Sequence, residues 1–307
     1  MKIICCSETR NVWPQLLTAA LPEAEVVEWR DDQPAQDADI AVVWRPPAQL
    51  FERERKLRAV FNLGAGVDGL LKLPTLPPEL PVVRLEDAGM AVQMSEYVVH
   101  YLTGVSRHFA AYAAQQRAAT WKPLPELRRD EWPVGVLGMG AMGAHVARTL
   151  AALEYPVAGW SRSGKAPEGV EAFGGVESLP AFLARTRVLV NLLPLTPDTE
   201  SLLRRETLSQ LLPGAYLINL GRGPHLVEED LVPLLDSGQL AGAALDVFRQ
   251  EPLPADHPFW TDPRIAITPH VGATSLQRET VAQITKKIRA LMRGEAVTGV
   301  VGRDRGY

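Results

Sequence analysis

The feature that most constrains the fold is a glycine-rich turn between a short apolar run and a helical pattern. Residues 133–137 read Pro-Val-Gly-Val-Leu without a helical period, and residues 138–143 read Gly-Met-Gly-Ala-Met-Gly. After this turn, Val146, Ala147 and Leu150 recur at helical spacing. The pattern predicts a strand, a tight turn and a helix, which together open a Rossmann fold.

Each glycine of the turn has a distinct expected role. Gly138 permits the tight turn, Gly140 leaves the backbone open to approach, and Gly143 lets the helix pack closely on the strand. The unpaired N–H groups of the helix N-terminus can bind phosphate. The turn therefore predicts a dinucleotide site, and a purely structural glycine turn is the alternative. The expected contacts come from Gly138, Gly140, Ala141, Met142 and Gly143.

The end of the second strand indicates which cofactor is bound. This strand is expected over 157–160 and is followed by Ser161, Arg162 and Ser163, with no acid. An acid here would accept from the ribose 2′-hydroxyl of NAD, whereas an arginine meets the 2′-phosphate of NADP. A guanidinium and two hydroxyls bind the phosphate that a carboxylate would repel. We expect NADPH/NADP, with NADH bound more weakly; a solvated Arg162 with no role is the alternative.

Composition limits the remaining possibilities. The chain has 307 residues, 46% hydrophobic and 22% charged, which is enough for two globular domains. A net charge of -4 argues against nucleic acid or an anionic membrane as partner. No leader pattern or membrane-length apolar stretch is present, so we expect a cytoplasmic protein. Cys5 and Cys6 are expected in a core, and no metal site is expected because His100 and His108 lack ligands at metal spacing.

The domain organisation follows from apolar runs that alternate with helical or loop segments. In the first part of the chain these runs are 3–6, 26–29, 40–44, 59–63 and 82–85, and in the later part 133–137, 157–160, 187–194, 215–219, 242–246 and 265–268. The later six match the strand count of a complete dinucleotide fold. A helical pattern over 275–292 lies outside this set and is free to return to the first domain.

We therefore predict an α/β protein: a Rossmann doubly wound parallel sheet plus a flavodoxin-like, discontinuous substrate domain. The substrate (lid) domain is expected over 1–94 and 276–307, and the NADP-binding domain over 95–275.

One long amphipathic helix is expected to link the two domains. Over residues 95–120, Val98, Leu102, Val105 and Phe109 fall on one face, with Ser95 in the preceding cap position. This helix would act as the hinge, and its apolar face would suit a subunit contact.

Three late strands are each followed by a side chain with catalytic potential. Arg222 follows the strand ending at 219, Glu251 follows that ending at 246, and His270 follows that ending at 268. Since the carboxyl ends of parallel strands meet at one crevice, we expect the three side chains to gather there. His270 could protonate a ketone oxygen during hydride transfer, Glu251 could favour the imidazolium, and Arg222 could bind a carboxylate. Taken singly, each residue is more often a surface or packing residue.

Three further loops carry candidate binding residues. The loop after the strand at 187–194 is expected to contact the cofactor through Pro194 and Thr199. The glycines of 62–68 expose main-chain N–H groups that can hold a carboxylate, and a plain glycine turn is equally compatible. Trp44 at a strand end either lines a substrate pocket or packs as a structural aromatic.

At this point the chain resembles the D-isomer-specific 2-hydroxyacid dehydrogenase family. The resemblance rests on Asn219-Leu220-Gly221-Arg222-Gly223, residues 238–248, Glu251-Pro252-Leu253-Pro254 and Thr268-Pro269-His270-Val271. Further motifs are similar to the glyoxylate/hydroxypyruvate reductase A group within that family, which prefers NADPH. They are Trp44-Arg45-Pro46-Pro47, residues 63–68, Arg84-Leu85-Glu86-Asp87, Trp160-Ser161-Arg162 and Arg305-Gly306-Tyr307.

The resemblance implies roles for individual residues. Arg222 would be the catalytic arginine, Glu251 the partner of the histidine, and His270 the proton donor. The main chain at Ala65 and Gly66 would lie near the substrate carboxylate. Asp246 would lie near the nicotinamide carboxamide, although a satisfied strand-end acid is the alternative; the turn Asn219, Leu220 and Gly221 would also contact the cofactor. His225 and His257 do not fall on catalytic positions of the family.

The expected activity is NADPH-dependent reduction of glyoxylate to glycolate and of hydroxypyruvate to D-glycerate. The resemblance also implies a homodimer that pairs through the 95–120 region. Two alternatives stay open: a dehydrogenase for a bulkier 2-oxo acid, and a nucleotide-sensing protein on the same fold.

Overall fold

The computed structural model divides into two compact units. It describes residues 1–8, 12–125, 128–303 and 306, so Arg305 and Tyr307 of the C-terminal motif lie outside the described residues. Unit 1 comprises 1–89 and 275–307, and unit 2 comprises 90–274. The predicted domains divide the chain at 94/95 and 275/276.

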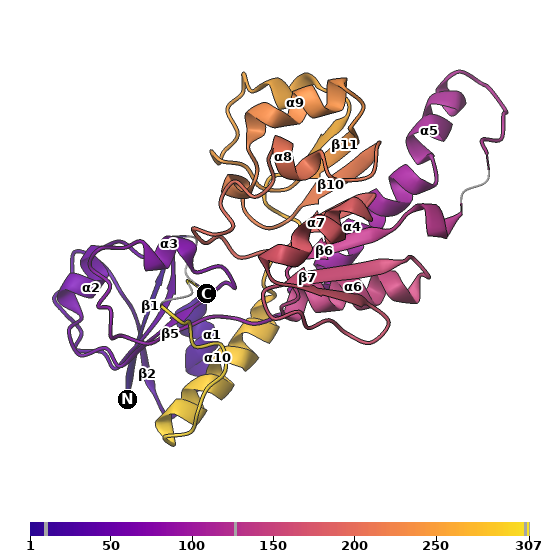
Figure 1. Ribbon diagram of the computed structural model, residues 1–307. Coiled ribbons are helices and arrows are strands. Elements are labelled where there is room, and N and C mark those ends of the chain that lie inside the picture. The colour runs from indigo at the N-terminus through magenta and orange to yellow at the C-terminus, as the bar shows by residue number, and fades with distance from the viewer. Residues whose placement is uncertain (9–11, 126–127, 304–305, 307) are drawn as a thin grey trace. The chain divides into compact units, whose positions relative to one another are not determined.

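Unit 1 is built on a five-stranded parallel sheet in the order β2-β1-β3-β4-β5 (Figure 1). This is the flavodoxin-like strand order. Cys5 and Cys6 lie buried in β1, as expected, and burial raises the pKa of their thiols to about 12 and about 11. The strands are β1 (Lys2–Ser7), β2 (Glu25–Glu28), β3 (Ile40–Trp44), β4 (Ala59–Asn62) and β5 (Val82–Val83), and the helices are α1 (Trp13–Ala20), α2 (Gln49–Arg53), α3 (Asp68–Leu71) and α10 (Gln277–Met292).

The C-terminal segment is an integral part of unit 1. Helix α10 packs on α1, and Ile284 and Ile288 on its inner face are almost fully buried. Beyond α10, Val300 forms an antiparallel bridge to Val83 of β5. The buried Lys287 ammonium donates to the carbonyl of Arg84 at 2.9 Å.

Unit 2 contains a seven-stranded parallel sheet in the order β12-β11-β10-β9-β6-β7-β8. Its strands are β6 (Val134–Leu137), β7 (Val157–Ser161), β8 (Glu171–Gly174), β9 (Val188–Asn191), β10 (Ala215–Asn219), β11 (Leu240–Leu245) and β12 (Ile265–Ile267). The expected count of six strands missed β8, a largely exposed edge strand without an apolar run. The order reverses between β6 and β9, and in open α/β sheets ligands bind at such a switch point.

Unit 2 also contains several helices, and one region of them differs from the prediction. They are α4 (Met90–Ser106), α5 (Phe109–Arg117), α6 (Ala141–Ala152), α7 (Leu179–Ala184), α8 (Arg205–Leu208) and α9 (Glu228–Asp236). The single helix expected over 95–120 is wrong: His108 adopts a left-handed conformation (φ +56°) that separates α4 from α5. Ser95 does not cap a helix but lies inside α4, where its hydroxyl donates to the Ala91 carbonyl at 2.8 Å.

Helix α5 has no buried residue, and Figure 1 shows it projecting beyond the sheet of unit 2 as an arm. Within the described ranges, no helix is both long and apolar enough to cross a bilayer.

Candidate active site

The glycine turn between β6 and α6 has the geometry that the sequence predicts. Gly138 has a φ of +98°, and a Cβ on Gly143 would lie 1.7 Å from the Gly138 carbonyl oxygen. A Cβ on Gly140, in contrast, would meet no atom within 4 Å. Gly138 and Gly143 are therefore required by the fold, whereas Gly140 leaves an open approach to the N-terminus of α6. Ala141 and Met142 form the first turn of that helix. The turn fits a dinucleotide pyrophosphate.

The end of β7 presents the groups expected at the adenosine ribose. Ser161 ends the strand, and Arg162 and Ser163 are exposed in the turn that follows. The Ser161 carbonyl accepts from the Gly164 N–H at 3.2 Å, and the Ser161 and Ser163 hydroxyls lie 3.4 Å apart. The turn thus places two hydroxyls and a guanidinium-bearing residue together, a set of donors that suits a phosphate.

Thr199, one of the predicted cofactor-binding residues, forms hydrogen bonds within the loop after β9. The Thr199 hydroxyl donates to the Pro194 carbonyl at 2.7 Å and accepts from the Thr196 N–H at 2.9 Å. The side chain of Thr199 therefore fixes the shape of this loop at the carboxyl edge of the sheet.

The predicted catalytic residues gather at the same edge. The Nδ1 of His270 lies 2.8 Å from Oε2 of Glu251, whose Oε1 accepts from the Phe248 N–H at 3.0 Å. Because a carboxylate only accepts, Nδ1 carries the hydrogen of this bond and Nε2 is left to act on a ligand. Arg222 follows β10, and its Nη1 donates to the Gly221 carbonyl at 2.8 Å.

The charges of this group act on the Glu251 carboxyl. Burial raises its pKa, but hydrogen bonds from the His270 ring and the Phe248 N–H, with the charges of His270 and Arg222, lower it by more. The net pKa of Glu251 lies below its ordinary value, so the carboxylate stays ionised beside the His270 ring.

The backbone around His270 is held by Asp246. His270 has a φ of +55°, which is strained for a residue other than glycine, and its N–H donates to the Asp246 carbonyl at 2.9 Å. The Asp246 carboxyl accepts from the N–H groups of Val271 and Gly272 at 2.8 and 2.9 Å and from the Thr268 hydroxyl at 2.6 Å. Asp246 thus fixes the His270 loop in this structure. Its contact with the nicotinamide stays a prediction.

A tyrosine on α4 extends this network. The Tyr97 hydroxyl lies 2.8 Å from that of Thr268, which itself donates to Asp246, so Tyr97 acts as the donor. Burial raises the pKa of Tyr97 and keeps it protonated. Sequence reasoning missed Tyr97 because a tyrosine on an amphipathic helix resembles ordinary core packing.

The Arg222 loop rests on buried polar side chains. Asn191 and Asn219 face each other at matching register on β9 and β10, with Asn191 Nδ2 donating to Asn219 Oδ1 at 2.9 Å. Both are fully buried, as is His225, which directly follows the loop. The buried amide of Asn219 donates to the Arg222 carbonyl at 3.3 Å. Leu220, another predicted cofactor-binding residue of this turn, is also buried, and its side chain packs on Gly272.

In unit 1, the two predicted substrate-binding segments lie together. A Cβ on Gly64 would meet the Trp44 ring at 2.3 Å, so the indole packs directly on the glycine loop. Asn62 Nδ2 donates to the carbonyls of Gly64 and Gly66 at 3.0 and 2.9 Å. Within the described part of the chain, no group accepts from the N–H of Ala65 or Gly66. These N–H groups are suited to a carboxylate, as the sequence predicts.

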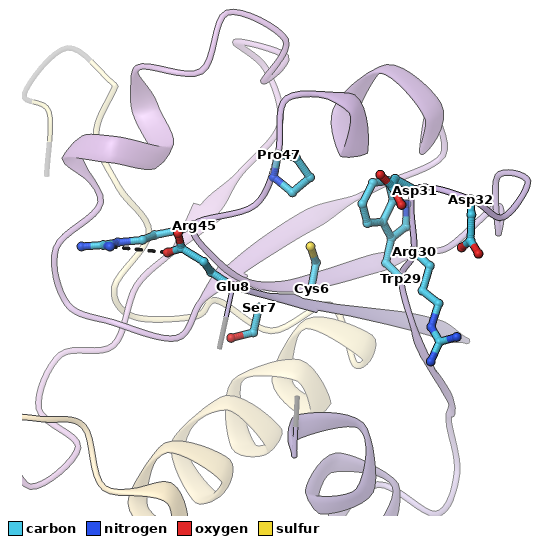
Figure 2. A pocket seen from close by; sticks show the side chains of 9 residues that line it. All are labelled: Cys6, Ser7, Glu8, Trp29, Arg30, Asp31, Asp32, Arg45 and Pro47. Carbon is cyan, nitrogen blue, oxygen red and sulfur yellow. Dashed lines mark hydrogen bonds and ion pairs between the residues drawn. The ribbon is translucent and has the colours of Figure 1, made fainter. Parts of the chain in front are cut away.

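A hollow that the sequence did not predict lies at the carboxyl edge of the unit 1 sheet. Its volume is about 600 Å³. Figure 2 shows Cys6 between the ion pair of Arg45 and Glu8 (3.4 Å) and the residues that follow β2, Trp29 to Asp32. The hollow mixes both signs of charge and so favours no one charged ligand. Its lining residues are Cys6, Ser7, Glu8, Trp29, Arg30, Asp31, Asp32, Arg45 and Pro47.

Comparisons with known proteins show the family to which the chain belongs. The sequence model of the D-isomer specific 2-hydroxyacid dehydrogenase NAD binding domain matches residues 99–272. A glyoxylate/hydroxypyruvate reductase A from Escherichia fergusonii is 49% identical over 302 residues, which cover 96% of each chain. One from Salmonella paratyphi B is 48% identical and covers 100% of both chains.

Solved structures match over the same extent. A D-isomer specific 2-hydroxyacid dehydrogenase from Xanthobacter autotrophicus Py2, in complex with NADPH and MES, has a TM-score of 0.92 and 38% identity, covering 99% of each chain. An NADPH-dependent glyoxylate/hydroxypyruvate reductase from Sinorhizobium meliloti, in complex with NADP and sulfate, has a TM-score of 0.91 and 37% identity, covering 100% of this chain and 99% of that one. With its glycine turn and its linked Glu251 and His270, the chain belongs to the D-isomer specific 2-hydroxyacid dehydrogenase family.

Proposed function

We propose that this protein is an NADPH-dependent reductase of small 2-oxo acids that converts glyoxylate to glycolate and hydroxypyruvate to D-glycerate. The observation that carries the proposal is the 2.8 Å hydrogen bond between Glu251 and His270, whose charges act together with that of Arg222. Relatives that are 48 to 49% identical bear the name glyoxylate/hydroxypyruvate reductase A.

The roles of the residues follow from their chemistry. The Arg222 guanidinium binds the substrate carboxylate through paired N–H groups and polarises the neighbouring carbonyl. His270 delivers the proton from Nε2 to the ketone oxygen, and the ionised Glu251 stabilises the imidazolium beforehand. Bound NADPH supplies the hydride that adds to C2. From unit 1, Trp44 and the N–H groups of Ala65 and Gly66 contribute to substrate binding.

The cofactor is held by the glycine turn and the groups after β7. The open approach at Gly140 and the N-terminus of α6 suit the pyrophosphate, and Ser161, Arg162 and Ser163 suit the 2′-phosphate. Solved relatives are complexes with NADPH or NADP. Further contacts are proposed from Pro194, Thr199, Asn219, Leu220, Gly221 and Asp246.

One assay tests this proposal: loss of reduced-nicotinamide absorbance across a panel of 2-oxo acids, with NADPH and with NADH. We expect glyoxylate and hydroxypyruvate to be reduced with NADPH more efficiently than with NADH. A preference for bulky 2-oxo acids would replace these substrates, and tight nucleotide binding without turnover would indicate a sensor. In the variant Arg162→Asp the efficiency ratio of NADPH to NADH should fall; an unchanged ratio would exclude Arg162 from the site.

We also propose that two copies pair through the 95–120 region in the cytoplasm. Phe109 and Tyr112 on the arm are 53% and 39% exposed, and Trp121 is 98% exposed, which is unusual for large apolar side chains. A reducing compartment suits the free cysteines Cys5 and Cys6. Sedimentation of the Trp121→Ser variant against the wild type tests the pairing, and cell fractionation tests the location.

A further inference from the structure

His225 is a fully buried histidine that the proposed reaction does not use. It ends the short turn Gly223–His225 directly after Arg222. Its place in the sequence indicates no catalytic role. Its surroundings, however, join two loops of the candidate site.

The neighbouring asparagine fixes how this network is oriented. Oδ1 of Asn191 accepts from the backbone N–H of Leu193 at 3.2 Å, so its Nδ2 must be the atom that faces Asn219 and His225. This Nδ2 lies 2.9 Å from Oδ1 of Asn219 and 2.9 Å from Nδ1 of His225. Each of its two hydrogens therefore has an acceptor.

The same reasoning fixes the tautomer of His225. Nδ1 accepts from the Arg222 backbone N–H at 3.0 Å as well as from Asn191, and therefore carries no hydrogen. The hydrogen lies on Nε2, which faces the Pro194 carbonyl at 3.2 Å. The ring thus has one accepting side and one donating side.

His225 forms hydrogen bonds with both the backbone N–H and the backbone carbonyl of Arg222. The Arg222 N–H donates to the His225 ring, while the Arg222 carbonyl accepts from the His225 N–H at 3.2 Å. There is little room to relax, because a Cβ on Gly221 would lie 2.7 Å from Asn191 Nδ2 and 2.9 Å from His225 Nδ1. On the other side of the ring, the Pro194 carbonyl also accepts from the Thr199 hydroxyl, in the same loop after β9.

We propose that His225 is a positioning residue: its Nδ1 side places the Arg222 backbone for substrate binding, and its Nε2 side places the Pro194 loop against the cofactor. This inference rests on the proposed function, because it takes Arg222 as the substrate anchor and Pro194 as part of the cofactor site. Buried side chains that hold a binding group within a fraction of an ångström act in this way.

Two amide variants separate the two sides of the ring. In His225→Asn, the side-chain oxygen replaces Nδ1 at the same distance in bonds from Cβ and can accept from Arg222, but nothing reaches Pro194. In His225→Gln, the side-chain nitrogen replaces Nε2 and can donate to Pro194, but no acceptor faces Arg222. His225→Phe removes both interactions at similar ring volume. Ser106→Ala is the matched control, because Ser106 is a fully buried polar residue of the same unit, and its hydroxyl lies 3.1 Å from that of Tyr155, away from both loops.

The measurements are the Kd of NADPH by fluorescence titration, the Kd of oxamate in the presence of NADPH, the KM and kcat for glyoxylate, and the thermal midpoint. We expect His225→Asn to keep oxamate Kd and glyoxylate KM within ~3-fold of wild type while weakening NADPH about fivefold to tenfold. His225→Gln should do the reverse, and His225→Phe should show both losses. Ser106→Ala should lower the thermal midpoint without altering either Kd.

Loss of both affinities to the same extent in the Asn and Gln variants would overturn the proposal, as would wild-type affinities in all three. Failure of both amide variants to fold would assign His225 to stability alone and would also overturn it. A wild-type chain that binds NADPH and oxamate yet reduces no 2-oxo acid would instead remove the proposed function, while the two Kd values would still test His225.

Discussion

The carboxyl edges of the two sheets are built in different ways. In unit 2 the edge rests on buried polar side chains with several hydrogen bonds each, among them Asn191, Asn219 and Asp246. In unit 1 the corresponding edge carries exposed ion pairs, such as Arg45 with Glu8, around an open hollow, and one buried amide, Asn62. Buried networks hold side chains in one geometry, whereas exposed ion pairs contribute little and adapt easily. The proton transfer proposed for His270 needs the fixed geometry of the first kind of edge.

The largest expected effect separates two glycines of the same turn. In Gly143→Ala the new methyl group would overlap the Gly138 carbonyl oxygen, so we expect a loss of about 3 kcal/mol or more in the free energy of unfolding. In Gly140→Ala the methyl group enters open space, so stability should be kept while NADPH binding is weakened. Denaturant unfolding and NADPH titration of both variants test this. Equal stability in the two variants would contradict the packing role of Gly143.

A second prediction concerns Glu251 and pH. In Glu251→Gln we expect kcat for glyoxylate to fall about 100-fold, because the imidazolium of His270 loses its partner.

The same variant tests how stability depends on pH. The pKa of Glu251 is lowered in the fold, so the stability it contributes is fully present above its ordinary pKa of 4.5 and is lost as the pH falls through the lower folded value. The difference in thermal midpoint between wild type and variant should therefore shrink as the pH falls below about 4.5. A gap that widened on acidification would refute this linkage.

A smaller effect is expected where the His270 loop meets α4. Thr268→Val keeps the shape of the side chain but breaks the link from Tyr97 to Asp246, so kcat should fall about tenfold with little change in NADPH affinity. Tyr97→Phe removes the outer link alone and should have a weaker effect. If Tyr97→Phe impaired turnover more than Thr268→Val, the order of the network would be wrong.

The smallest effect is expected at the edge of unit 1. Both side chains of the Arg45 and Glu8 pair are about 60% exposed. Glu8→Gln should therefore change the free energy of unfolding by less than about 0.5 kcal/mol, as measured by denaturant unfolding. A loss of several times that size would show that this edge is as constrained as that of unit 2.

Much of the site could be predicted because its signals are local. The glycine turn and the polar residues that follow the strands are visible in a single sequence, and the parallel sheet brings Glu251 and His270 together. The parts that were missed depend on tertiary structure. Strand β8 has no apolar run, and the break at His108 depends on a backbone conformation that residue type does not reveal. The contact of the buried His225 with Asn191 joins residues 34 positions apart, which sequence spacing does not reveal.

The catalytic role proposed for the edge of unit 2 rests on His270 as the proton donor. The most direct test is the variant His270→Gln, whose amide can hydrogen-bond a carbonyl oxygen but has no acidic proton to transfer. We predict that NADPH affinity stays within about threefold of wild type while kcat with glyoxylate falls by about 10² to 10⁴. Turnover close to that of the wild type would contradict the account.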